Sequence, residues 1–170
     1  LVDAYLTDAQ ANEYSVEQVA LLEHAKLTGR ITYEEAAEAV DKSLACVSDA
    51  GYHVERYPPK VTAGFAKIEY FYEGPASGNP VADACFRVHS KAIEDLYQLQ
   101  PTSVAAQNAR EADLAPEVQD CLAGVGVEVS FEGLTGDELT VAIHEALNEQ
   151  IDAARDGSPQ GLDCFAILAD

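Results

Sequence analysis

Hydrophobic residues recur at helical spacing along much of the chain, and capping residues mark where several helices begin. Thr7–Gln10 and Ser15–Gln18 both have the capping-box pattern, which predicts one helix interrupted near Tyr14, or two short helices. A third capping box, Thr32–Glu35, opens a helix that we expect to end at Gly51, where glycine can adopt the left-handed conformation. The apolar residues of this helix share one face: Ala36, Ala37, Val40, Leu44 and Val47.

Two strands are predicted next, followed by a helix. Tyr52–Tyr57 indicates a short strand, and the alternation in Phe65–Glu73 indicates a longer, half-buried one. Asn79-Pro80 is a favourable cap and first-turn pair for an amphipathic helix over Val81–Leu99. The polar, Ala-rich segment Pro101–Pro116 predicts a linker or a loosely packed helix.

The last third of the chain combines helix and strand patterns. Pro116 is expected to open a short helix that ends before Gly124. Val125–Phe131 alternates strictly and predicts a strand, and the apolar run Leu162–Leu168 predicts a central strand covered on both faces. Between them, Thr135–Glu138 caps a long helix that ends near residues 156–159 and carries four apolar residues on one side: Leu139, Ile143, Leu147 and Ile151.

These elements predict a single α+β domain over residues 1–170. About four strands, mostly antiparallel, pack against four or five helices. A weak internal duplication is expected, with residues 30–100 and 113–170 as its two halves.

The duplication rests on the positions of the four cysteines. Cys46 and Cys121 each lie near a helix end, before a glycine and a strand, and Cys85 and Cys164 each follow after a similar length of chain. This repeat favours disulfides between Cys46 and Cys85 and between Cys121 and Cys164, although four cysteines allow three pairings. Coincidence between two common helix-to-strand turns is the alternative, as are four buried thiols in a cytosolic protein. No CxxC pair that would indicate a zinc site is present.

The residues around the cysteines resemble a group of bacterial proteins. Ala45-Cys46 to Gly51, Asp83-Ala84-Cys85 and Asp120-Cys121-Leu122 are similar to segments of uncharacterised actinobacterial secreted proteins and lipoproteins, whose alpha-beta modules contain paired cysteines. The resemblance covers a small part of the chain. It implies export and disulfides, and it supplies no activity and no catalytic residue.

The charge balance excludes two classes of partner. With 30 acidic and 10 basic residues, the formal charge is −20 at pH 7. Binding to nucleic acid or to an anionic membrane surface depends on Lys and Arg, so we expect neither. A cationic peptide, a cell-wall component or another protein is the expected partner.

Composition also bears on the compartment. The sequence contains no methionine and begins at Leu1, so we expect that an upstream segment, with any signal peptide or lipid-anchor cysteine, was removed. We expect no membrane insertion, because no apolar stretch is long enough. Together with the cysteines, this favours an extracellular location or the outer face of the cytoplasmic membrane.

Candidate chemistry is sparse, and we assign no catalytic residue, no metal site and no cofactor. The histidines, His24, His53, His89 and His144, are assigned structural roles. A Cys85–His89 nucleophile requires a free thiol, which a disulfide would remove. Asp152–Asp163 shares only part of the calcium-loop pattern, so the end of a helix is the simpler interpretation. The acidic groups at 34–38, 111–113 and 137–138 are equally consistent with caps and solvated faces.

One aromatic cluster has two interpretations. Tyr52, Tyr57, Phe65, Tyr70, Phe71 and Tyr72 lie close together in the sequence. They fill the core, or Phe71 with Tyr57 or Phe65 forms a recognition patch, since aromatic residues are enriched at interfaces. The leading hypothesis is an exported binding module. The alternatives are a hydrolase that uses carboxylates or histidine, and a cytosolic acidic protein adapted to high salt.

Overall fold

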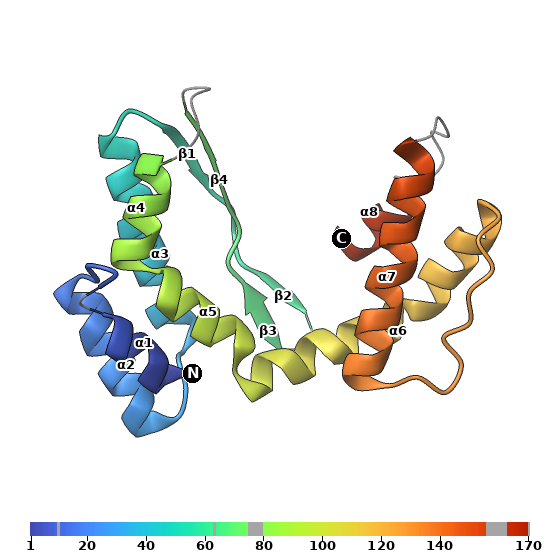
Figure 1. Ribbon diagram of the computed structural model, residues 1–170, viewed down its shortest axis with the longest axis horizontal. Coiled ribbons are helices and arrows are strands. Elements are labelled where there is room, and N and C mark those ends of the chain that lie inside the picture. The colour runs from blue at the N-terminus through green and yellow to red at the C-terminus, as the bar shows by residue number, and fades with distance from the viewer. Residues whose placement is uncertain (10, 63, 75–79, 156–162, 170) are drawn as a thin grey trace. The chain divides into compact units, whose positions relative to one another are not determined.

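The computed structural model describes all residues except 10, 63, 75–79, 156–162 and 170 (Figure 1). The described residues form eight helices and two small two-stranded sheets, which confirms the predicted α+β class with more helices than expected. The chain divides into two compact units. Unit 1 comprises Leu1–Val61 and Phe65–Val104, and unit 2 comprises Thr62–Gly64 and Ala105–Asp170.

The elements follow one another along the chain as helices, then strands, then helices. They are α1 (Val2–Asp8), α2 (Val16–Thr28), α3 (Tyr33–Asp49), β1 (His53–Arg56), β2 (Lys60–Thr62), β3 (Phe65–Lys67), β4 (Tyr70–Glu73), α4 (Pro80–His89), α5 (Lys91–Leu99), α6 (Pro101–Gly124), α7 (Gly136–Arg155) and α8 (Asp163–Ala169).

Side-chain caps begin two helices of unit 1. The Ser15 hydroxyl accepts a hydrogen bond from the third residue of α2 at 3.1 Å. Thr32 and Glu35 form a complete capping box at the start of α3, with bonds of 3.2 and 2.8 Å. These caps satisfy amides that the first helical turn leaves without a backbone partner. Thr7 is not a cap, because it already lies within α1, where its hydroxyl donates to the Asp3 carbonyl at 2.8 Å.

The strands form two separate sheets. β1 and β4 pair antiparallel, with Glu55 opposite Phe71, and β2 pairs with β3 around Gly64, whose φ is +82°. The single strand predicted over Phe65–Glu73 is therefore wrong: its two ends belong to different sheets. Ile68, which follows β3 and precedes β4 in the sequence, is only 8% exposed and belongs to the core of unit 1.

The single long helix predicted after these strands is two helices, α4 and α5, that separate at Ser90. The φ and ψ angles of Ser90 are −137° and −25°, outside the helical range. Gln18, which is fully buried in α2, donates to the carbonyls of Arg87 and Val88 at 2.9 and 2.8 Å and accepts from the Ala92 amide at 3.1 Å. Gln18, about 70 residues away in the sequence, thus provides hydrogen-bond partners for backbone groups on both sides of Ser90.

The core of unit 1 lies between its helices and the inner face of the β1–β4 sheet. Tyr70 stacks on Phe86 and Phe65 stacks on Tyr97, each with ring centroids 5.1 Å apart. These contacts confirm core packing for most of the aromatic cluster.

Unit 2 contains most of α6, from Ala105 on, together with α7 and α8. The predicted stripe on α7 packs inward, since Leu139, Ile143 and Leu147 are buried, whereas the side chain of Ile151 lies outside the described ones. Val118 and Leu122 of α6 are fully buried in the same core.

Three predictions for this region are wrong. Pro116 lies inside α6 rather than at a helix start; Pro116 and the residue one turn before it are exposed, so water can hydrate the carbonyl that proline leaves without a donor. Val125–Phe131 is not a strand, although its side chains alternate between buried or half-buried and exposed. The described part of Leu162–Leu168 is helical, as α8, because a short apolar run suits a buried helix as well as a strand.

Candidate functional site

The cysteines are joined in two disulfides, the pairing that the internal repeat favoured. Cys46 bonds to Cys85 and Cys121 to Cys164, with Cα–Cα distances of 5.8 and 5.7 Å. Each bond lies within one unit. Since Cys85 is oxidised, it provides no thiolate for a Cys85–His89 nucleophile.

The histidines lie apart from one another in the sequence, and three of them contact a glutamate. The distances are 3.3 Å for His24 to Glu35, 3.6 Å for His53 to Glu55 and 3.4 Å for His144 to Glu111. At least half of each of these imidazole side chains is exposed. The three pairs are therefore contacts near the protein surface.

The acidic groups mostly serve local structure. Glu35 caps α3, Glu38 lies 3.0 Å from Lys42, and Asp137 accepts a hydrogen bond from Asn108 at 2.8 Å. Among the residues that the structure describes, no group of three or more His, Cys, Asp or Glu side chains could hold a metal ion. The calcium-loop segment Asp152–Asp163 lies mostly outside the described residues.

Two surfaces of unit 1 combine exposed chemistry with a defined geometry. The first is the outward face of the β1–β4 sheet, which we call the acidic-aromatic face. It consists of two cross-strand pairs, His53 with Glu73 and Glu55 with Phe71, and of Tyr57 and Glu69 just beyond the strand ends, where the Tyr57 amide donates to the Glu69 carbonyl at 3.0 Å.

Aromatic rings are exposed on this face. Tyr57 and Phe71 are 43% and 44% exposed, whereas Phe65 packs against Tyr97 in the core. The recognition patch considered from the sequence is thereby reduced to Phe71 with Tyr57.

Carboxylates surround these rings. The Tyr57 hydroxyl donates to Glu55 at 3.2 Å, and desolvation together with this carboxylate raises the pKa of Tyr57. Glu69 is paired with Lys67 at 2.8 Å. Within the described part of the chain, no Lys or Arg pairs with Glu55 or Glu73; Glu55 contacts the His53 imidazole at 3.6 Å and accepts the hydrogen bond from Tyr57.

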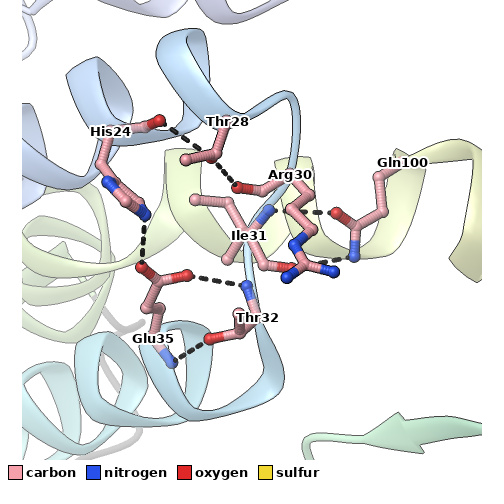
Figure 2. Close-up of polar contacts among 7 residues, drawn as sticks. All are labelled: His24, Thr28, Arg30, Ile31, Thr32, Glu35 and Gln100. Atoms are coloured by element: carbon pink, nitrogen blue, oxygen red, sulfur yellow. Dashed lines mark hydrogen bonds and ion pairs between the residues drawn. The ribbon is translucent and has the colours of Figure 1, made fainter.

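The second surface is the turn between α2 and α3, shown in Figure 2. Gly29 ends α2 with φ of +77°, and the Thr28 hydroxyl lies 3.1 Å from the Arg30 carbonyl. The side-chain amide of Gln100 pairs with both backbone groups of Ile31, at 3.1 and 3.0 Å. The backbone on both sides of Arg30 is therefore fixed by hydrogen bonds.

The nearby carboxylate is occupied elsewhere. Glu35 uses one oxygen for the Thr32 amide and the other for His24 (Figure 2). Among the described residues no carboxylate pairs with the Arg30 guanidinium, although Arg30 and Glu35 line the same polar depression. Sequence reasoning missed Arg30, and its only signal was a basic residue directly after a helix stop in an acidic chain.

Comparisons of the chain with protein-family models, with curated proteins and with solved structures found no match. None of the described helices combines the length and the apolar character that a membrane-spanning helix needs. The function therefore has to be inferred from the residues of the two surfaces.

Proposed function

We propose that this chain is an exported, disulfide-stabilised binding module whose acidic-aromatic face binds a cationic protein segment. The observation that carries the proposal is the exposure of Tyr57 and Phe71 beside Glu55 and Glu73, two carboxylates without a Lys or Arg partner among the described residues.

Export is supported by the two disulfides. Bonds of this kind persist in oxidising compartments, and cytosolic proteins rarely keep them. The resemblance of the cysteine segments to actinobacterial secreted proteins and lipoproteins is consistent with this location.

Recognition of a cationic segment is supported by charge and by ring geometry. Phe71 lies directly opposite Glu55 in the ladder, so a lysine or arginine that approaches the Phe71 ring can contact the ring and the Glu55 carboxylate together. A cation over an exposed aromatic ring contributes about 0.5–1 kcal/mol. The net charge of −20 adds long-range attraction, which increases the association rate and weakens with salt.

Fluorescence anisotropy with a labelled peptide of alternating lysine and glycine tests the binding face. Phe71→Ser should weaken binding about threefold, and Glu55→Gln should weaken it to a similar extent. The matched controls are Val16→Ser, at an exposed apolar position in α2, and Glu23→Gln, at an exposed acidic position in the same helix. A glutamine–glycine peptide controls for backbone binding.

The control variants distinguish a defined face from diffuse charge. If Glu23→Gln weakens binding as much as Glu55→Gln does, the peptide is responding only to net charge, and the proposed face is wrong. Export is tested separately by counting thiols in denatured, unreduced protein from its native source. Four reactive thiols would contradict export.

A further inference from the structure

A pocket of about 210 Å³ lies in unit 1, where the ends of α2 and α5 meet the start of α1. Its apolar floor includes Ala25, Ile31 and Leu96, which are 3%, 2% and 7% exposed. Leu99, 59% exposed, also lines it. An apolar cavity of about 150 Å³ is large enough for benzene, so this pocket has room for an apolar group of about six to eight carbon atoms.

Among the described residues that line this pocket, Arg30 alone has a charged side chain. As described above, its backbone is held by Thr28 and by the Gln100–Ile31 pairing, and no described carboxylate neutralises it. Other cations of unit 1 are paired: Lys26 with Asp3 at 2.7 Å, for example, and Arg56 with Asp41 at 3.2 Å. An apolar pocket with one free guanidinium complements a ligand that has an apolar body and one negative charge.

We infer that this pocket binds a small monocarboxylate, with its apolar group on the floor and its carboxylate on Arg30. The planar guanidinium presents parallel N–H donors that match the two oxygens of a carboxylate. A cationic ligand would be repelled, and a neutral one would leave the guanidinium without a partner.

The test is an NMR titration of the full chain with three ligands that share one apolar group: phenylpropionate, phenylpropanol and phenylpropylamine. Amide resonances of Gly29–Ile31 and Leu96–Leu99 report binding. Phenylpropionate should bind about fivefold more tightly than phenylpropanol, the gain from one exposed ion pair. Phenylpropylamine should bind most weakly, and acetate, which lacks the apolar group, should not bind detectably.

Variants assign the effect to the residues. Arg30→Gln should lower the affinity for phenylpropionate to that for phenylpropanol. Lys26→Gln also removes one positive charge, but from a residue of α2 outside the pocket lining, and should leave the affinity difference between the two ligands unchanged. Leu99→Ser should weaken both ligands, whereas Leu27→Ser, at an 87% exposed position outside the pocket lining, should not.

Three results would overturn the inference: no shifts at the pocket amides with phenylpropionate, equal affinity for phenylpropanol, or equal effects of Arg30→Gln and Lys26→Gln. The inference does not depend on the acidic-aromatic face. Glu55→Gln should leave phenylpropionate binding unchanged, so failure at one surface can be separated from failure at the other.

Discussion

Gln18→Met tests how the interrupted helix pair α4–α5 is held in unit 1. Methionine is similar in length to glutamine but has no amide, so the substitution removes three hydrogen bonds, one buried and two part-buried, with little change in volume. The carbonyls of Arg87 and Val88 and the amide of Ala92 lose their side-chain partner. The Ser15 amide still donates to the Val88 carbonyl at 2.8 Å.

The expected loss follows from these bonds. At about 1 kcal/mol each, three hydrogen bonds are worth about 3 kcal/mol, and more if the buried backbone groups find no water. For a unit of roughly 100 residues, this lowers the melting temperature by about 12 °C or more.

Tyrosine fluorescence is the assay, because all eight tyrosines lie between Tyr5 and Tyr97 and so follow unit 1 alone. The control is Gln98→Met, at an exposed position in α5, which should change stability by less than about 0.5 kcal/mol. If Gln18→Met is no more destabilising than Gln98→Met, the bonds around Ser90 do not hold the helices together, and the reasoning is refuted.

Three further outcomes can be measured by unfolding. Replacing both Cys121 and Cys164 by alanine should destabilise unit 2 by about 4 kcal/mol on the chain-entropy model; hydrogen exchange in α6 would show it, and an unchanged exchange rate would contradict it. Burial raises the pKa of Glu94 while the Tyr70 hydrogen bond opposes the rise, so the contribution of Glu94 to stability is largest below the ordinary carboxyl pKa and is lost as pH rises through its folded-state pKa. Glu94→Gln should therefore stabilise the protein more near pH 7 than at about pH 4 in urea unfolding, and the opposite order would refute this. Thr32→Ala should cost about 1 kcal/mol through loss of the α3 cap, and Thr32→Ser should restore most of it.

The features predicted correctly from the sequence depend on local interactions. The Thr32–Glu35 box and the Gly51 stop involve groups a few residues apart, and a residue pattern records them directly. The inward stripe of α7 is likewise a property of one helix. The fixed geometry of the α2–α3 turn was not predicted, because it depends on the Gln100–Ile31 pairing, which joins residues 69 positions apart.

The wrong predictions share a different cause. In Val125–Phe131 the alternation correctly marks which side chains face the core, but a strand also needs a neighbouring strand, and the described residues provide none there. In α8 the apolar run records burial, with Cys164 fully buried, but burial alone does not select a period. At Ser90 the helix is interrupted, and the buried Gln18 of α2 bonds to the backbone there. The helical pattern of residues 81–99 does not indicate this interruption.

Net charge alone predicts one ligand preference for the whole surface, yet the two surfaces of unit 1 carry opposite local charges: carboxylates on the acidic-aromatic face and the Arg30 guanidinium at the α2–α3 turn. At the acidic-aromatic face, Lys67 pairs with Glu69, whereas Glu55 and Glu73 have no Lys or Arg partner among the described residues. At the α2–α3 turn, Glu35 is committed to the Thr32 amide and to His24, and Arg30 keeps its charge. Two oppositely charged groups a few ångströms apart neutralise each other, and salt screens more distant charges. We therefore expect the ligand preference of each surface to depend on its groups without an oppositely charged partner rather than on the total charge of −20. Both proposals rest on this distinction: a cationic segment at the acidic-aromatic face, and a carboxylate at Arg30.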